Sequence, residues 1–266
     1  MQRYGWDKAA RDYEAGWRVQ LEPAQSQMLE IAALQPGERV LDVACGTGLV
    51  SFRILDAVGG TGAVVGTDIS AEMVAMARGL AAERGIRNAT FERLDAEAMA
   101  LDEADFDVAV CALGLMYVPD PVKALGEMYR LVKPGGRAAA SVWGARGKCG
   151  WAEIFPIVDA RVASEVCPMF FQLGTKDSLA RCFAEAGFIN VRSERLEVDL
   201  PFASDDDALH AAFRGGPVAL AYSRFDDPTR ESANAEYLRS IEPYRDGGRY
   251  RIPGEFVATV GLKPGR

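Results

Sequence analysis

A glycine-containing loop in the first third of the chain has the residue types of a nucleotide-binding site. An apolar run that begins at Val40 contains Asp42 and leads into Gly46 and Gly48. Glycine lets a ligand approach the backbone closely, and open α/β sheets bind ligands at the carboxyl ends of their strands. A dinucleotide fingerprint would require a third glycine where Ser51 stands, which disfavours a nicotinamide cofactor.

Acidic residues follow the next two predicted strands. Asp68 comes directly after the apolar run 63–67, and the pair Asp95 and Ala96 follows the run 89–92. A carboxylate at the end of the second strand can accept hydrogen bonds from both hydroxyls of a ribose. Because the carboxyl ends of parallel strands meet at one edge of a sheet, these acids and the glycine loop should converge on one ligand.

The elements that position these residues alternate as in a parallel sheet covered by helices. Helical periodicity separates the strands, and Ser70 is a suitable N-cap for the helix after the second strand. The first five predicted strands are 39–44, 63–67, 89–92, 105–111 and 137–143. Two later strands, 188–198 and 254–262, should form an antiparallel pair. We therefore predict an α/β, Rossmann-like fold with a seven-stranded, mostly parallel sheet, an antiparallel last strand and a helical cap.

Taken together, these segments resemble the class I S-adenosylmethionine-dependent methyltransferases, most closely the group similar to the ubiquinone/menaquinone C-methyltransferases. The resemblance covers about residues 1–200, including a Lys-Pro-Gly-Gly turn at 133–136 and the opening segment 6–13. It implies S-adenosylmethionine as the cofactor, a small molecule as the methyl acceptor, and no metal. The enzyme would transfer the methyl group by in-line displacement.

The resemblance also implies which residues contact the cofactor. The glycine loop would hold the methionine part, Asp68 the ribose, and Asp95 with Ala96 the adenine. The complete implied set is Tyr13, Asp42, Gly46, Gly48, Asp68, Ile69, Met73, Asp95, Ala96 and Cys111.

Two insertions interrupt the regular alternation of elements. We interpret 1–266 as one methyltransferase domain with an N-terminal helical segment (1–35) and a cofactor-binding core (36–144). The insertions, 145–173 and 201–253, are longer than ordinary connections and have helical periodicity of their own. We expect them to form a cap over the active site.

Candidates for acceptor binding and catalysis come from fewer signals. Tyr117 and Trp143 follow the fourth and fifth strands, where the methyl group must emerge, so we expect them to line the acceptor pocket together with Phe213. His210 is the only histidine and the only side chain whose unperturbed pKa lies near neutrality. By elimination, it is the candidate general base if the acceptor must lose a proton. A surface or capping role for His210 is the alternative.

Composition restricts the partners. A formal net charge of −8 disfavours nucleic acid, whose binding depends on Lys and Arg neutralising phosphates. No apolar run approaches the roughly 20 residues that cross a bilayer, and the start is not a signal peptide. We expect a cytoplasmic enzyme that acts on a small, partly apolar or aromatic metabolite.

Three alternatives remain open at this point. A nicotinamide-dependent oxidoreductase would share the fold, and a non-catalytic S-adenosylmethionine-binding protein would share the cofactor loop. Five cysteines without a CxxC motif predict neither a disulfide framework nor a zinc site. Cys149, Cys167 and Cys182 nevertheless leave a thiophilic acceptor such as arsenite as a lesser possibility.

Overall fold

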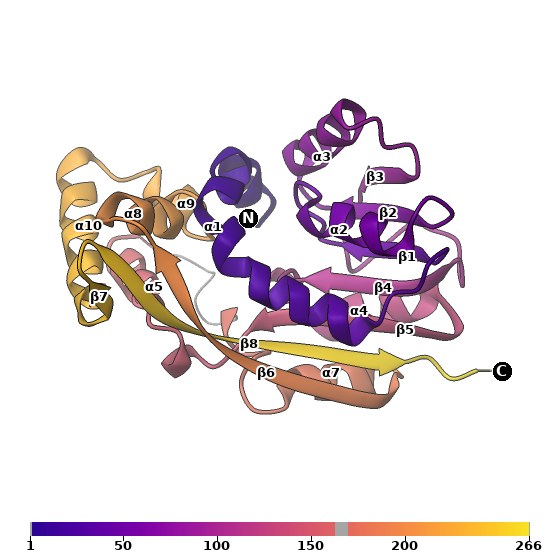
Figure 1. Cartoon of the computed structure of the whole chain (residues 1–266). Coiled ribbons are helices and arrows are strands. Elements are labelled where there is room, and N and C mark those ends of the chain that lie inside the picture. Colours follow the sequence, from indigo (N-terminus) through magenta and orange to yellow (C-terminus); the bar gives the residue numbers. More distant parts are fainter. Residues whose placement is uncertain (1, 163–169, 266) are drawn as a thin grey trace.

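The computed structural model describes residues 2–162 and 170–265. Its sheet has the strand order β3-β2-β1-β4-β5-β8-β6, with the short strand β7 paired to β8 (Figure 1). The strands are β1 Arg39–Val43, β2 Ala63–Asp68, β3 Ala89–Arg93, β4 Phe106–Ala112, β5 Val132–Trp143, β6 Ile189–Phe202, β7 Arg245–Asp246 and β8 Arg249–Leu262. Strands β1 to β5 are parallel, whereas β8 is antiparallel to both β5 and β6. The predicted fold class is confirmed, with two-residue β7 as an addition.

Helices cover both faces of the sheet and extend beyond one end of it. They are α1 Gln2–Ala32, α2 Leu49–Val58, α3 Ala71–Glu83, α4 Pro121–Leu131, α5 Ile154–Asp159, α7 Ser178–Glu185, α8 Asp205–Phe213, α9 Ala219–Tyr222 and α10 Asp227–Ile241. Helices α8, α9 and α10 lie at the end opposite α2 and α3, and α1 lies between the two groups (Figure 1). No helix in the described part of the chain has the length and hydropathy needed to span a bilayer.

Successive strand residues point to opposite faces of the sheet, and each face packs against its own apolar core. The central strands are therefore almost entirely apolar. Val40 and Val64 face the core under α2, α3 and the second half of α1. Leu41 and Val65 face the core that also contains α4, α7 and most of the buried aromatic residues. As predicted, Ser70 caps α3, its hydroxyl accepting a hydrogen bond from the N–H of Met73 at 3.2 Å. The tip of β2 is thereby fixed to α3.

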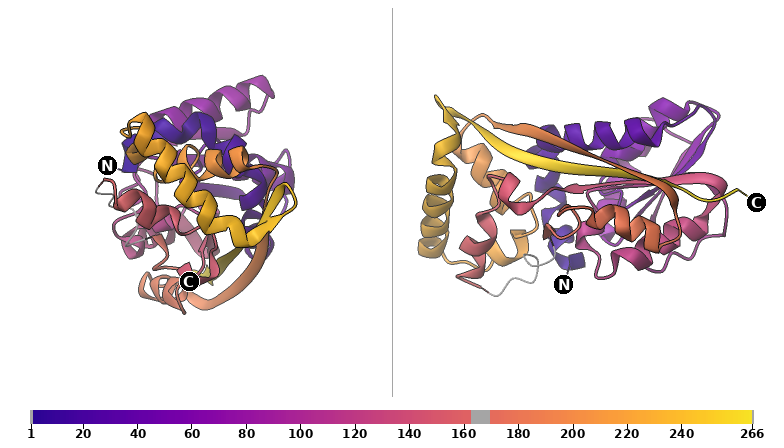
Figure 2. Two further views of the ribbon diagram at one scale, coloured as in Figure 1. Left: turned by 90° about the vertical axis from the view of Figure 1, so that its left-hand side faces the viewer. Right: turned by 90° about the horizontal axis from the view of Figure 1, so that it is seen from below.

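Strands β6 and β8 form a ribbon that runs along the molecule from the core to the cap helices (Figure 2). Their pairing extends from Ile189 opposite Leu262 to Phe202 opposite Tyr250. The segment that leaves the sheet is therefore shorter than the predicted insertion at 201–253, because the first and last residues of that range are paired within β6 and β8. Pro253 fits there because β8 pairs with β5 only as far as Phe256, so no strand on that side needs the missing N–H.

Candidate active site

A cavity of about 320 Å³ lies at the carboxyl ends of β1, β2 and β4. The strand tips supply one wall, and α1 supplies a second wall with Trp6, Tyr13 and Trp17 among its residues. Trp151, Phe170 and the segment 215–217, all from the two insertions, complete it. The cavity is thus built by segments that are far apart in the sequence.

The structure brings most of the residues predicted for the cofactor to this cavity. Those that line it are Tyr13, Asp42, Gly46, Asp68, Ile69, Met73, Asp95 and Ala96. Gly48 and Cys111 do not line it. Gly48 has a φ of 91° at the start of α2, and a Cβ there would lie 2.9 Å from the Phe52 ring. This glycine therefore allows the backbone conformation of the loop and its close packing on Phe52, without lining the cavity itself. Cys111 is buried, and burial raises the pKa of its thiol to about 12.

Asp42 has one satisfied and one unsatisfied carboxylate oxygen. The Ser51 hydroxyl donates a hydrogen bond to Oδ2 at 2.5 Å. The other oxygen, Oδ1, is buried and has no hydrogen-bond partner within the described structure. Burial raises the pKa of Asp42 to about 7, with a smaller contribution from the charge of Asp68, while the Ser51 hydrogen bond opposes the rise. A buried carboxylate of this kind calls for a cationic or hydrogen-bonding partner in the cavity.

Asp68 is held by backbone donors on both oxygens. Oδ2 accepts from the N–H of Gly46 at 2.9 Å, and Oδ1 accepts from the N–H of Ser70 at 2.8 Å. Burial raises the pKa of Asp68 and these two hydrogen bonds oppose the rise. The Ser70 hydroxyl in turn donates to Asp7 of α1 at 2.5 Å. The tip of β2 therefore connects the glycine loop to the N-terminal helix.

Two residues of the cavity wall have strained backbones. Ala44 follows β1 with a φ of 56°, and Leu113 follows the neighbouring strand β4 with a φ of 58°. Side chains other than glycine rarely adopt this region, and such strain concentrates at ligand sites. Gly114 is needed beside them, because a Cβ there would lie 2.5 Å from the Cβ of Ala44. No sequence signal marks these positions, since neither alanine nor leucine favours a positive φ.

Aromatic rings from three elements surround the side of the cavity near β4. Tyr117 contacts Trp6 edge-on at a ring separation of 4.8 Å and Phe170 at 5.4 Å. Trp6 also contacts Tyr13 at 5.6 Å. Burial raises the pKa of Tyr117 well above its usual range, and nearby Tyr13 adds to the effect. Tyr117 thus presents a neutral hydroxyl rather than a phenolate.

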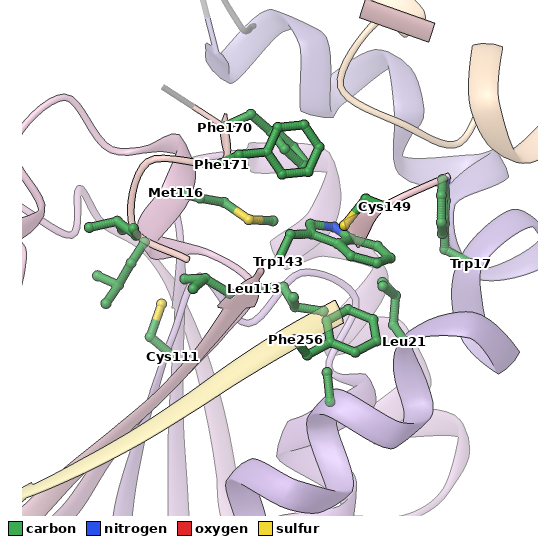
Figure 3. Packing of buried hydrophobic residues seen from close by; sticks show 14 of the residues in the cluster. Trp17, Leu21, Cys111, Leu113, Met116, Trp143, Cys149, Phe170, Phe171 and Phe256 are labelled. Carbon is green, nitrogen blue, oxygen red and sulfur yellow. The ribbon is translucent and has the colours of Figure 1, made fainter. Parts of the chain in front are cut away.

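A second aromatic group continues this wall toward the cap. Trp143 at the end of β5 lies between Phe256 and the Phe170–Phe171 pair (Figure 3). Its ring centroid is 4.2 Å from that of Phe256 and 4.7 Å from that of Trp151. The indole N–H of Trp151 is buried without a hydrogen-bond partner in the described structure. Tyr117 and Trp143 both line this cavity, and their predicted contact with the acceptor stays a prediction.

The structure does not bring His210 or Phe213 to the cavity lining. The His210 ring packs against α1, where a Cβ added to Gly16 would lie 3.4 Å from its Cδ2. Phe213 stacks on Tyr222 inside the cap, with centroids 4.5 Å apart. The turn after α8 reaches the cavity instead, through 215–217. The roles proposed for His210 and Phe213 stay predictions.

Sequence reasoning missed the contribution of α1 beyond Tyr13. Trp17 and Leu21 line the cavity from one face of this helix, and Gln25 extends the same face by one more turn. Their spacing of four residues was the available signal. This spacing predicts that one face of the helix is buried, but it does not predict which part of the molecule packs against that face.

The charged side chains that line the cavity are acidic. Among the described lining residues, the charged side chains are Asp42, Asp68, Asp95 and Glu97, and none is Lys, Arg or His. This set, the unpaired oxygen of Asp42 and the open backbone of Gly46 suit a cationic, ribose-containing ligand. No group of three metal-ligating side chains occurs among the described residues.

Comparison with known proteins identifies the class. The family described as "Methyltransferase domain" matches residues 34–169. The chain belongs to this family and is an S-adenosylmethionine-dependent methyltransferase. This assignment sets aside the nicotinamide-dependent alternative.

Named relatives refine the comparison. The chain is 31% identical over 194 residues to the ubiquinone/menaquinone biosynthesis C-methyltransferase UbiE of Ectopseudomonas mendocina, covering 72% of this chain and 74% of that protein. It is 40% identical over 120 residues to UbiE of Bdellovibrio bacteriovorus, covering 45% of this chain and spanning only half of that protein's length.

Solved structures agree on the fold. Haemonchus contortus phosphoethanolamine N-methyltransferase 2, in complex with S-adenosyl-L-methionine, superposes with a TM-score of 0.63 at 16% identity, covering 97% of this chain and 57% of that one. The YcgJ protein of Bacillus subtilis gives a TM-score of 0.63 at 18% identity, covering 92% and 100%. At these identities, the similarity shows the fold alone.

Proposed function

We propose that the enzyme methylates a small, uncharged aromatic acceptor of the phenol or hydroquinone class. The observation that carries this proposal is the aromatic half of the cavity, where Trp143, Trp151, Tyr117 and Phe170 line one continuous wall. Flat apolar rings pack favourably against such side chains, whereas a charged acceptor would find no basic partner among the described lining residues. The names of the UbiE relatives support a quinone-related acceptor methylated on carbon.

The acidic half of the cavity would hold the cofactor. We assign the ammonium group of its methionine part to the free oxygen of Asp42 and the ribose hydroxyls to Asp68. Asp95 and Ala96, after β3, would flank the adenine as the resemblance implies. When bound, S-adenosylmethionine supplies a methyl group activated by the adjacent sulfonium.

The protein's own contribution to catalysis is orientation and exclusion of water. The buried aromatic wall would hold the acceptor ring against the cofactor half, which would convert a bimolecular encounter into a positioned reaction. Tyr117, kept neutral, and Trp151, with its unpaired N–H, can donate hydrogen bonds to an acceptor oxygen. Such donors stabilise the negative charge on a phenol oxygen as the ring becomes nucleophilic. The bond from the acceptor to the methyl group would form as the bond from that methyl group to the cofactor sulfur breaks, S-adenosylhomocysteine would leave, and the proton that the acceptor loses would pass to solvent with the products. The proposal therefore requires no base from His210.

Methyl transfer to a defined panel of acceptors tests the proposal. We expect purified enzyme with S-adenosylmethionine to methylate uncharged hydroquinones and phenols, detected as one added methyl by mass spectrometry. Carboxylated or phosphorylated analogues of the same rings should react at least about a hundredfold more slowly, because their charge would be buried without a partner. Equal rates for charged and uncharged rings would contradict the assignment. Cofactor binding without transfer to any acceptor in the panel would contradict the proposed acceptor class.

A further inference from the structure

Ser51 occupies the position where a dinucleotide fingerprint has its third glycine. It lies in the first turn of α2, and its side chain is completely buried. Its hydroxyl donates to Oδ2 of Asp42 at 2.5 Å, a length typical of a strong hydrogen bond to a carboxylate. The departure from the glycine pattern therefore creates a specific contact between α2 and the end of β1.

Among the residues that the structure describes, no cation faces Asp42. The titratable groups that face it are Asp68 from β2, Cys45 from the glycine loop and Cys111 from β4, and none of them carries positive charge. With Oδ2 held by Ser51, the carboxylate has its second oxygen buried and unpartnered beside the cavity. A ligand in the cavity that Asp42 lines can supply the remaining partner.

We infer that Ser51 is a positioning residue, which holds the Asp42 carboxylate with its second oxygen turned toward the ammonium group of the cofactor. This inference rests on the cofactor assignment made above. Ser51 touches neither the acceptor nor the transferred methyl group, so it acts only through Asp42. Its hydroxyl orients the carboxylate, an effect that does not depend on pH, and it also stabilises the ionised form of Asp42. Loss of the second effect weakens binding more as the pH falls.

The electrostatic effect has a definite sign. A hydrogen bond to the ionised form lowers the pKa of a carboxyl, and Ser51 provides such a bond to a carboxyl whose pKa burial has raised to about 7. The ammonium group needs the ionised form of Asp42. Cofactor affinity should therefore fall as the pH drops below about 7, with release of a proton on binding. Without the Ser51 hydroxyl, this fall should begin at a higher pH.

Calorimetric titration with S-adenosylmethionine between about pH 6 and pH 9, in buffers of different ionisation enthalpy, measures affinity and proton release together. For Ser51→Ala, we expect about tenfold weaker binding at pH 7 and affinity within about threefold of wild type at pH 9. Ser51→Thr, which keeps the hydroxyl, should restore the wild-type profile. Ser141→Ala is the matched control, because Ser141 is also fully buried but lies 3.9 Å from Met28 Sδ and contacts no carboxylate.

A pH profile for Ser51→Ala that coincides with the profile of wild type or is weakened equally at every pH would overturn the inference. If Ser51→Ala does not fold, Asp42→Asn decides, since it should bind without releasing a proton; release equal to wild type would overturn the inference. Failure of the folded wild type to bind S-adenosylmethionine would instead contradict the cofactor assignment itself.

Discussion

The carboxylate of Asp68 accepts a hydrogen bond from the backbone N–H of Gly46 at 2.9 Å, although 22 residues separate the two in sequence. The tip of β2 thereby fixes the loop that follows β1. Asp68 is thus part of the framework of the site as well as the candidate ligand for the ribose. Substitutions at this position should affect both functions.

Asp68→Ala should weaken S-adenosylmethionine binding at least tenfold, because charge-assisted hydrogen bonds of about 1.5–3 kcal/mol are lost. It should also lower the free energy of unfolding, because the N–H groups of Gly46 and Ser70 lose their acceptor. Calorimetry and urea titration measure the two effects. Asp56→Ala, at an exposed position on α2, is the control. Unchanged cofactor affinity in Asp68→Ala would show that the ribose binds elsewhere.

Gly46→Ala should separate cofactor binding from stability. Gly46 has a φ of 55°, so alanine there costs about 1 kcal/mol in backbone strain. Within the described part of the chain and apart from its sequence neighbours, the added Cβ would have only Met73 Sδ within 4 Å, at 3.9 Å, so the methyl group would occupy space in the cavity. Gly85→Ala has a similar φ of 64° with no atom within 4 Å. Both variants should lose similar stability, but only Gly46→Ala should bind cofactor more weakly. Equal affinities would contradict the placement of the cofactor over Gly46.

Asp42 should make the ligand-free enzyme less stable as the pH rises. Its pKa is raised from 3.8 to about 7 in the folded state, so the unfolded chain loses this proton first. Stability from this group is present below about pH 4 and is lost as the pH rises to about 7, by up to about 4 kcal/mol. Asp42→Asn removes the titration. Urea titrations should show the variant gaining stability relative to wild type between about pH 4 and pH 8, and a constant difference would contradict the burial of an ionisable Asp42.

Trp151→Phe tests the unpaired indole N–H. The substitution keeps an aromatic ring in the wall and removes the donor, so KM for a phenolic acceptor should rise about fivefold while cofactor affinity is unchanged. Trp17→Phe is the matched control, because the Trp17 N–H already donates to the carbonyl of Ala211 at 2.8 Å. The control should mainly lower the melting temperature. If the two variants raise KM equally, the Trp151 N–H does not bind the acceptor.

His210→Ala distinguishes positioning from general base catalysis. Because His210 packs against Gly16 and does not line the cavity, we expect kcat to change less than about threefold. A base that removes a proton in the transition state contributes about a hundredfold or more. A loss of that size, with cofactor affinity unchanged, would restore the catalytic role predicted by elimination.

The convergence of the residues predicted for the cofactor was predictable because most of them lie at or just after the carboxyl end of a strand. Asp42, Asp68 and Asp95 are separated in sequence, but parallel pairing alone brings the ends of β1, β2 and β3 together. The residue types, together with the rule that parallel strands bring their carboxyl ends to one edge of the sheet, therefore suffice to predict that these three acids converge.

The aromatic half depends on packing that periodicity does not specify. The pattern of α8 identifies a buried face, but α1 occupies that face, and the following turn at 215–217 reaches the cavity in place of His210. The length of the β6–β8 ribbon was underestimated for a related reason. Pro201 and Pro253 look like breaks in the sequence, yet each sits where its missing N–H is not needed by a partner.

The position of β8 determines the order in which this sheet can be completed. β8 is the last strand along the chain, yet it lies between β5 and β6, and within the described residues β6 is bonded to the sheet only through it. During synthesis, β6 must wait for residues 249–262 before it can pair. Helix α1, which precedes every strand of the sheet, also packs against β8. Elements far apart in the sequence thus close the fold together, and such long-range closure slows folding.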